Sequence, residues 1–359
     1  GDPVMVEEPG WAVEYARLAA MGMRVLPVPR GPEGPDMAVM QRYCETMAPK
    51  LYVSVSVLHN PTGYSLSAAS AHEVLQMAQR YGFYVVEDDS YCHIAPDHAP
   101  RVTVLDRLQR SIYISGFAKV LVPNWRLGYL AAPPDLVERL LDTKLLSTLS
   151  TPTPMEQALA LCMEQGQLRR HAERLRQHLA KARTRSVALA QAAGCRFVAE
   201  PAGMFGWVDT GVDTEVLTQH LLDEGYMIAP GAMFHASRGS STCMRINFAT
   251  TQDATFWRVF ERVVAKMRQQ ACHAFTALLP GLDEYGCHCV AAARQRRQTS
   301  GNQTPQGAAG QWHRLRRFRW PGGTSASRLR PCAVASWPFA RHRWRHRGRQ
   351  SHTRRQNPC

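Results

Sequence analysis

The chain has 359 residues, enough for about two or three domains with sizeable cores. Its net charge of +14 lies in one segment, because residues 271–359 contain 16 arginines and only two acids, whereas residues 1–270 hold 27 basic and 27 acidic side chains. The basic character therefore belongs to the C-terminal segment, and without any run of about eighteen apolar residues no membrane-spanning helix is expected.

Short β-branched runs alternate with longer amphipathic runs in the N-terminal part of the chain. Candidate strands span residues 4–6, 24–28, 51–57, 83–86, 111–115 and 127–131. Residues 11–22 and 67–82 have helical periodicity, and each stretch ends in a glycine. The alternation predicts an α/β fold with a mainly parallel sheet covered on both faces, as a large domain over residues 1–150.

Residues 151–194 are expected to form a bridging helical segment that is heavily charged on one face, with Gly166 as the break. A smaller α+β domain is predicted over residues 195–270. Its candidate strands span residues 196–198, 204–208 and 244–248, and its candidate helices span residues 214–224 and 253–269.

The composition changes in residues 271–359, which contain no lysine and four of the eight tryptophans. A basic tail with aromatic side chains can bind nucleic acid through phosphate contacts and base stacking. The alternative is an arginine-rich tail without folding logic, disordered or translated out of frame. We favour the second interpretation because the segment has no hydrophobic periodicity.

Ten cysteines are scattered along the chain without a CxxC pair. This pattern favours the reducing cytoplasm over a disulfide-linked secreted domain. The CHC triplet at Cys287–Cys289 has no second pair of ligands nearby in the sequence. We therefore expect a cytoplasmic protein and no metal site.

Distinctive polar and aromatic residues follow four of the predicted strands. They form the sequences EPGW, HNPTG, EDDSY and GFAK, after the first, third, fourth and fifth strands. In an open parallel sheet, ligands bind in the crevice outside the carboxyl ends of the strands. Arg126 precedes the sixth strand and joins the same edge if that strand runs antiparallel. The sequence thus predicts a single crevice formed by five elements.

Lys119 is one of five lysines in residues 1–270 and lies in an apolar run after the fifth predicted strand. Partial burial among Phe117, Val120 and their neighbours would lower the lysine pKa and supply the neutral amine that carbonyl chemistry needs. The alternative is a lysine whose stem packs while its ammonium group reaches water. Taken alone, the residue leaves both interpretations open.

The motifs NPTG and EDDSY, together with the spacing from Lys119 to RLGY, resemble those of fold-type I pyridoxal-phosphate enzymes, specifically class I/II aminotransferases. The resemblance extends over residues 1–269. It implies that Lys119 forms a Schiff base with pyridoxal 5'-phosphate and moves a proton between substrate and cofactor. It also implies that Asp88 pairs with the pyridine nitrogen, and that Tyr91 and Asn60 hydrogen-bond the phenolic oxygen.

The same resemblance assigns the remaining contacts. Arg126 looks like the phosphate-binding arginine, and Trp11 like the aromatic residue that stacks on the cofactor ring. Arg245 is similar to the arginine that, with Asn60, binds the substrate, because its planar fork suits a carboxylate. The residues expected to line or support the substrate pocket are Gly203, Phe205 and Trp207.

The sequence departs from the family pattern near the cofactor phosphate. The family usually has serine or threonine where this chain has Gly116 and Ala118, so Ser115 is the expected substitute donor. The family's glycine-rich phosphate loop and first strand would precede Gly1. We therefore expect an N-terminally truncated member of the family.

Residues 113–146 look most like the aminotransferase-like module of MocR-type regulators, which belong to the GntR group and carry an upstream winged helix-turn-helix. Two functions remain open. One is an enzyme that transfers an amino group between an amino acid and a 2-oxo acid, and the other is an effector-sensing domain without its winged helix. The resemblance implies small-molecule partners and a homodimer, with DNA contacted only through an upstream winged helix and no membrane partner.

Overall fold

The computed structural model describes the backbone of residues 1–278 and the side chains of residues 1–271. Residues 279–359, which include the CHC triplet and most of the predicted tail, lie outside the described residues. Within residues 1–278, no helix is both long and apolar enough to cross a bilayer.

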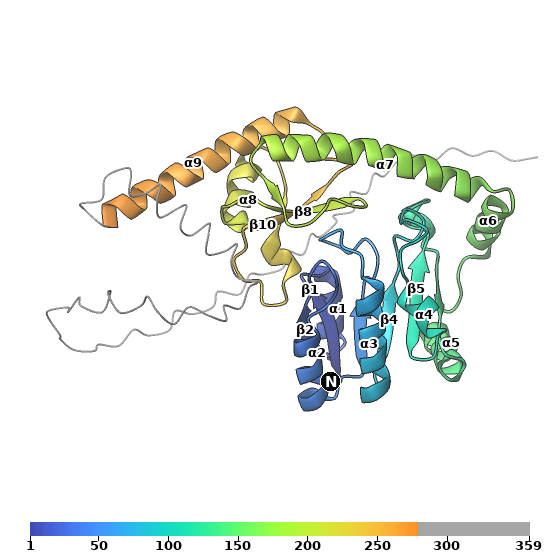
Figure 1. The fold of residues 1–359 in the computed structure, drawn as a ribbon. Helices are drawn as coiled ribbons and strands as arrows, with labels where there is room; N and C mark the ends of the chain where they lie inside the picture. The colour runs from blue at the N-terminus through green and yellow to red at the C-terminus, as the bar shows by residue number, and fades with distance from the viewer. Residues whose placement is uncertain (279–359) are drawn as a thin grey trace, which may run out of the picture. The chain divides into compact units, whose positions relative to one another are not determined.

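Six strands form one sheet in the order β2-β1-β3-β4-β5-β6 (Figure 1). Strands β1 to β5 pair in parallel, and β6 runs antiparallel to β5. The predicted α/β class and the conditional antiparallel sixth strand are therefore both confirmed. The strand bounds are Pro3–Glu8 for β1, Arg24–Pro29 for β2, Leu51–Ser54 for β3, Tyr84–Asp88 for β4, Ser111–Gly116 for β5 and Gly128–Ala131 for β6.

Helices cover both faces of this sheet because successive strand residues point to opposite sides. Met5 packs into one core with α2 (Met37–Met47) and α3 (Ala68–Tyr81), whereas Val4 and Val6 pack against α1 (Ala12–Ala20). Asp36 caps the start of α2, and its carboxylate accepts from two backbone N–H groups. Gly82 ends α3 with a φ of +78°, as its sequence position predicted.

The connecting helices are α4 (Val102–Asp106), η1 (Pro123–Trp125), α5 (Pro134–Thr148), α6 (Thr153–Glu164) and α7 (Gln167–Ala192). The break expected at Gly166 is observed between α6 and α7, where this glycine has a φ of +65°. Helix α7 packs against residues that follow the strands of the first sheet and against the core of the second sheet. Leu179 lies in a cluster with Tyr91, and Ala190 lies in the core of the second sheet.

The second sheet has the antiparallel order β7-β8-β10-β9. Its strands are β7 (Arg196–Phe197), β8 (Phe205–Asp209), β9 (Ala229–Pro230) and β10 (Cys243–Asn247), accompanied by α8 (Thr214–Asp223), η2 (Gly231–Phe234) and α9 (Ala254–Leu278). Aromatic side chains of α9, among them Trp257 and Phe260, pack on Phe248 and Leu217 in its core. This is the smaller α+β unit that the sequence predicted.

Several element boundaries differ from the sequence-based expectations, and three of them bear on the site or on the domain limits. Strand β3 ends at Ser54 rather than residue 57, because the N–H of Val55 donates to the carboxylate of Glu7 and the carbonyl of Ser56 accepts from Leu66. Strand β1 continues to Glu8, two residues further than expected. Helix α9 continues to Leu278, so the expected boundary at residue 270 falls inside it.

Candidate active site

The strand ends that carry the predicted crevice residues lie at one edge of the sheet. Since β1, β3, β4 and β5 are parallel, the EPGW, HNPTG, EDDSY and GFAK segments leave the sheet at the same edge. The antiparallel pairing of Gly116 with Gly128 brings the residues before β6 to this edge as well. Five segments that are distant in sequence therefore meet at one edge.

Asp88 and Tyr91 lie at the carboxyl end of β4. Asp88 is the last strand residue, and its carboxylate accepts from the backbone N–H of Ser90 at 3.0 Å. Tyr91 is 6% exposed, and burial raises the pKa of its phenol to about 12, with a smaller rise from the negative charge of Asp88. The phenol is therefore protonated, and can donate a hydrogen bond, throughout the neutral pH range.

Lys119 lies in the turn after β5, and its Nζ is 6.0 Å from the centre of the Tyr91 ring. The expected partial burial of this lysine is wrong, because its side chain is exposed. Phe117 and Val120 occupy the buried positions of the turn, so Lys119 lies outside the core on the side of Tyr91. The amine and the phenol are thus near one another at the crevice.

Arg245 on β10 reaches the crevice from the second sheet. Its Nη1 donates to Asn60 Oδ1 at 2.9 Å, and its guanidinium lies 4.5 Å from the ring centre of Phe205 and 5.0 Å from that of Phe234. Burial lowers the pKa of Arg245, and the nearby Tyr91 opposes this. No carboxylate among the side chains of residues 1–271 pairs with Arg245, so its charge is open to an anion.

The other predicted contact residues are less closely grouped. Trp11 precedes α1 at the same edge, is 40% exposed, and lies 5.6 Å below the guanidinium of Arg17. Arg126 is exposed between η1 and β6, with a left-handed φ of 55°. Ser115 is 4% exposed and donates its hydroxyl to the carbonyl of Asp89 at 2.9 Å. Its hydroxyl therefore already has an acceptor inside the protein.

The three residues expected around the substrate pocket lie in or beside β8. Phe205 contacts Arg245 and meets the Tyr91 ring edge-on at 6.0 Å between centres. Trp207 packs edge-on against Phe234. Gly203 has a φ of +62°, and a Cβ there would lie 3.0 Å from the side chain of Leu58. A larger residue at this position would strain the backbone and collide with the loop before Asn60.

Glu7 is a buried site-supporting residue that the sequence prediction missed. Its carboxylate accepts from the Ser54 hydroxyl at 2.9 Å and the Val55 N–H at 2.8 Å, and forms an ion pair of 3.0 Å with Arg30. Burial raises the pKa of Glu7, and the Arg30 charge opposes this rise. The predicted first strand stops at residue 6 and leaves Glu7 outside it. The place of Glu7 in a strand that is paired on both sides is apparent only from the structure.

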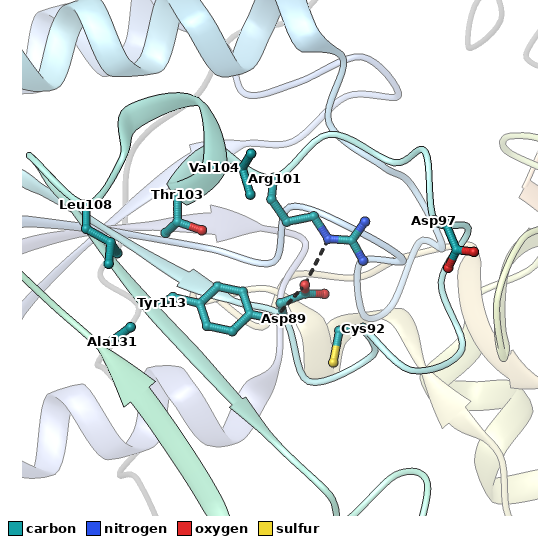
Figure 2. A pocket seen from close by; sticks show the side chains of 9 residues that line it. All are labelled: Asp89, Cys92, Asp97, Arg101, Thr103, Val104, Leu108, Tyr113 and Ala131. Atoms are coloured by element: carbon teal, nitrogen blue, oxygen red, sulfur yellow. Dashed lines mark hydrogen bonds and ion pairs between the residues drawn. The ribbon is translucent and has the colours of Figure 1, made fainter. Parts of the chain in front are cut away.

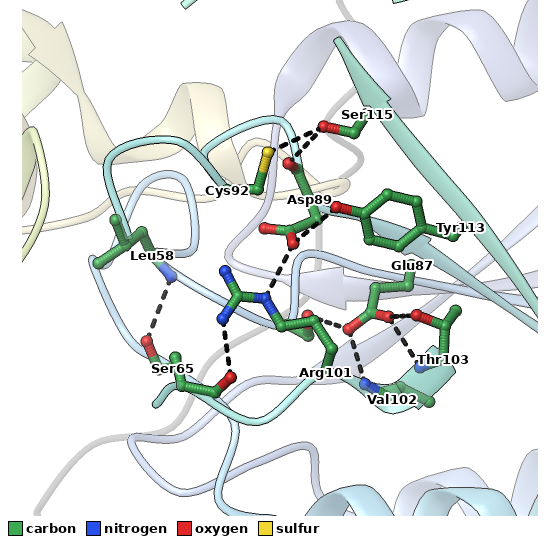
Figure 3. Close-up of polar contacts among 12 residues, drawn as sticks. Leu58, Ser65, Glu87, Asp89, Cys92, Arg101, Val102, Thr103, Tyr113 and Ser115 are labelled. Atoms are coloured by element: carbon green, nitrogen blue, oxygen red, sulfur yellow. Dashed lines mark hydrogen bonds and ion pairs between the residues drawn. The ribbon is translucent and has the colours of Figure 1, made fainter. Parts of the chain in front are cut away.

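A second buried acid, Glu87, anchors the start of α4 (Figure 3). It accepts from the N–H groups of Val102 and Thr103, each at 2.8 Å, and from the Thr103 hydroxyl at 2.6 Å. The Ser56 hydroxyl also donates to it. Glu87 therefore connects β4 to both the loop after β3 and the segment after Tyr91.

Asp89 follows β4 directly and is buried. It accepts from Arg101 Nε at 2.9 Å and from the Tyr113 hydroxyl at 3.0 Å, while its buried Oδ1 has no partner among the described side chains. These groups form the polar side of a cavity of about 530 Å³ (Figure 2). Its apolar side consists of Val104, Leu108 and Ala131.

No group of three or more His, Cys, Asp or Glu side chains among the described residues is arranged to hold a metal ion. The Cys287–Cys289 triplet lies outside the described residues.

The sheet order, the second sheet and the residues at the crevice define a fold-type I pyridoxal-phosphate transferase fold. The solved structure of LysN, an alpha-aminoadipate aminotransferase from Thermus thermophilus in complex with N-(5'-phosphopyridoxyl)-L-leucine, has a TM-score of 0.69 and 26% identity to this chain. The match covers 75% of this chain and 72% of LysN. The family model of aminotransferase class I and II matches residues 1–263, so the chain belongs to this family.

Curated relatives fall into two kinds. A 2-aminoadipate transaminase of Thermus thermophilus is 29% identical over 260 residues, which cover 70% of this chain and 65% of the relative. The HTH-type transcriptional regulator YjiR of Escherichia coli is 28% identical over 277 residues, which cover 73% of this chain and 57% of the relative. The chain thus spans less than two thirds of the length of each.

Proposed function

We propose that the chain binds pyridoxal 5'-phosphate through Lys119 and transfers an amino group between an amino acid and a 2-oxo acid. The observation that supports this function is the convergence of Asn60, Asp88, Tyr91, Lys119 and Arg245 at one edge of the sheet. Membership of the aminotransferase family and the likeness to a phosphopyridoxyl-bound aminotransferase support the same cofactor.

The residues fit the two ends of the cofactor ring. Bound pyridoxal phosphate supplies an electron sink for the reacting carbon. Asp88 is a carboxylate suited to keep the ring nitrogen protonated, and Tyr91, whose phenol stays protonated, donates to the phenolic oxygen. Asn60 donates there as well, because its Oδ1 is taken by Arg245 and its nitrogen keeps its hydrogens. Lys119 holds the cofactor and moves the proton at the substrate Cα.

The contacts to the substrate carboxylate and to the cofactor phosphate are assigned to two arginines. Arg245 binds the substrate carboxylate, since two aromatic rings hold its guanidinium in place and no described acid neutralises it. Arg126 binds the cofactor phosphate, and Trp11 stacks on the ring. For Ser115 to donate to the cofactor phosphate, its hydroxyl has to give up its hydrogen bond to the Asp89 carbonyl.

The alternative function is an effector-sensing domain of a MocR-type regulator. The HTH-type regulators among the relatives favour it. Such a domain needs the same cofactor residues, and DNA binding would require a winged helix-turn-helix upstream. The two functions differ in turnover. A transaminase converts the cofactor with an amino acid and regenerates it with a 2-oxo acid, whereas a sensor holds the effector without completing this cycle.

The organisation of the chain is part of the proposal. Residues 1–150 form the cofactor-binding domain, residues 151–194 the bridge, residues 195–270 the small domain and residues 271–359 the tail. A homodimer is the proposed assembly. The five cysteines whose side chains are described are free thiols, which favours the proposed cytoplasmic location.

The test is Lys119→Ala in the full chain with added pyridoxal 5'-phosphate. The unaltered protein is expected to develop visible absorbance that this variant lacks, because an imine needs the amine of Lys119. Lys144→Ala on α5 is the matched control, since Lys144 is also exposed but lies on a helix without contact to the crevice residues. Equal absorbance in the Lys119 and Lys144 variants would refute the assignment.

A further inference from the structure

The loop that carries Asn60 is connected to the interior of the protein by a series of buried polar contacts. His59, 1% exposed, has its Nε2 3.3 Å from Glu7 Oε2 and its Nδ1 2.8 Å from the Thr62 hydroxyl. The Thr62 hydroxyl also accepts from the backbone N–H of Tyr64 at 3.2 Å. These hydrogen bonds therefore connect the backbone of the loop to strand β1.

The direction of each hydrogen bond in this series follows from the donor inventory. Glu7 accepts hydrogen bonds from Tyr52, Ser54 and Val55, and the charge of Arg30 lies 3.0 Å away, so Glu7 is an ionised acceptor. Burial and the neighbouring Arg30 charge put the pKa of His59 well below its usual value, so the imidazole is neutral. Its Nε2 must then carry the hydrogen toward Glu7, and its Nδ1 accepts from the Thr62 hydroxyl.

Backbone contacts leave the loop little freedom. The His59 N–H donates to the Tyr64 carbonyl at 2.8 Å, and the Gly63 N–H donates to the His59 carbonyl at 2.6 Å. Gly63 has a φ of +77°, and a Cβ there would lie 3.0 Å from the Phe205 carbonyl. Asn60 is thus fixed between this closed loop and Arg245, which occupies its Oδ1.

Stability alone is a weak reason for so much buried charge. Buried ion pairs can often be replaced by apolar side chains of similar volume without loss of stability, because desolvation offsets the attraction between the charges. The buried Nη2 of Arg30 has no hydrogen-bond partner within the described residues, which adds to the cost of the arrangement. A role in fixing position accounts for the network better.

We infer that Glu7, His59 and Thr62 form a positioning relay that fixes the side-chain amide of Asn60 toward the phenolic oxygen of the cofactor. The three residues are positioning residues, since they act through Asn60. This inference deepens the proposed function and rests on it for the identity of the group that Asn60 faces.

The experiment compares Thr62→Val with Thr62→Ser in the full chain. Valine keeps the volume of threonine but removes the hydroxyl, whereas serine keeps the hydroxyl. The first readout is the pH midpoint of the visible absorbance with pyridoxal 5'-phosphate bound. A fixed donor stabilises negative charge on the phenolic oxygen of the cofactor. When Asn60 is loosened this stabilisation weakens, so the pKa that the absorbance midpoint reports should rise. Thr62→Val is expected to raise the midpoint by about half to one pH unit, the size of one neutral hydrogen bond.

The second readout needs no cofactor. Hydrogen exchange at the Gly63 amide, which bonds to His59 and not to Thr62, reports how firmly the loop is closed. Thr62→Val is expected to speed this exchange about tenfold or more, and Thr62→Ser to leave it near the unaltered rate. His59→Gln, which can donate to Glu7 but lacks the second ring nitrogen, is expected to change both readouts in the same direction and replaces Thr62→Val if that variant does not fold.

The outcomes separate the inference from the proposed function. Unchanged midpoint and exchange in Thr62→Val would overturn the relay, as would an equal shift in Thr62→Ser. Absence of visible absorbance in the unaltered protein would overturn the proposed function instead. In that case the exchange at Gly63 still decides whether the relay fixes the loop.

Discussion

Glu7, near the end of β1, and Asp89, directly after β4, are buried carboxylates, and each is paired with an arginine. The ion-pair distances are nearly equal, 3.0 Å for Glu7 with Arg30 and 2.9 Å for Asp89 with Arg101. Their surroundings differ. The Glu7 and Arg30 side chains are 3% and 0% exposed, whereas Arg101 is 14% exposed beside the cavity.

The difference shows that contact distance alone does not decide what an ion pair contributes. Arg30 has little access to water and donates to one carbonyl, that of Gly31, so Glu7 is the counter-charge on which it depends. Arg101 also donates to the carbonyls of Pro96 and Ala99 and keeps some contact with solvent. We therefore expect changes at Glu7 to be costly and changes at Asp89 to be tolerated better.

The largest expected effect is that of Glu7→Gln. This change leaves the Arg30 charge buried without a counter-charge, and should lower the free energy of unfolding by about 3–5 kcal/mol. Urea unfolding of the purified chain measures it. The matched control is Glu224→Gln, which breaks an exposed pair with Arg262 and should cost about 0–1 kcal/mol. Equal losses for the two variants would contradict the comparison.

A smaller loss is expected for Asp89→Asn. Asparagine keeps the size of the side chain and one acceptor, and Arg101 keeps its carbonyl partners, so the free energy of unfolding should fall by about 1–3 kcal/mol. Asp97→Asn, at a side chain that is 97% exposed, is the control and should stay within about 0.5 kcal/mol. If Asp89→Asn proves as costly as Glu7→Gln, burial of the arginine is not the deciding factor.

The smallest expected effect is a pH dependence confined to the Glu7 region. The pKa of His59 is lowered in the folded chain, so below about pH 6.5 the unfolded chain binds a proton that the folded chain refuses. Stability should therefore fall with decreasing pH, by up to about 1.4 kcal/mol per pH unit from this residue. The raised pKa of Glu7 acts in the opposite sense, because the folded chain then takes up its proton more readily than the unfolded chain.

The contribution of His59 is isolated by subtracting the pH profile of His59→Gln. Unfolding in denaturant at several pH values between about 7.5 and 5.5 gives both profiles. The unaltered protein should lose more stability than the variant across this range. Parallel profiles would show that His59 becomes protonated in the folded chain.

Much of the fold could be predicted from the sequence because hydrophobic period and glycine punctuation are local signals. All six strands of the first sheet begin within one residue of the predicted positions, and Gly82 and Gly166 mark observed helix boundaries. The two-residue strand β9 and the short helix α4 were missed, because neither has enough residues to show a period. Helices α2 and α5 were missed as well, although each is long enough to show one. The end of β3 depends on Glu7, which is distant in sequence.

The site was predictable where strand topology alone brings residues together. Strand topology brings the segments that carry Asp88, Lys119 and Arg126 to the same edge of the sheet, while the exposure of Lys119 depends on how one turn packs. The buried relay was not foreseen, because a glutamate directly after a predicted strand is typical of a loop. Only the pairing of β1 on both sides shows that Glu7 lies inside the sheet.

Arg245, the proposed carboxylate-binding residue, illustrates a benefit of building such a group into the packed part of a protein. Its guanidinium lies against Phe205 and Phe234 and bonds to Asn60, so its rotamers are already restricted before any anion arrives. Freezing a free arginine side chain costs about 1.5–2 kcal/mol in entropy. In this protein folding already restricts the arginine side chain. Binding of the proposed carboxylate would therefore lose less entropy, and more of the attraction to the guanidinium would appear as binding affinity.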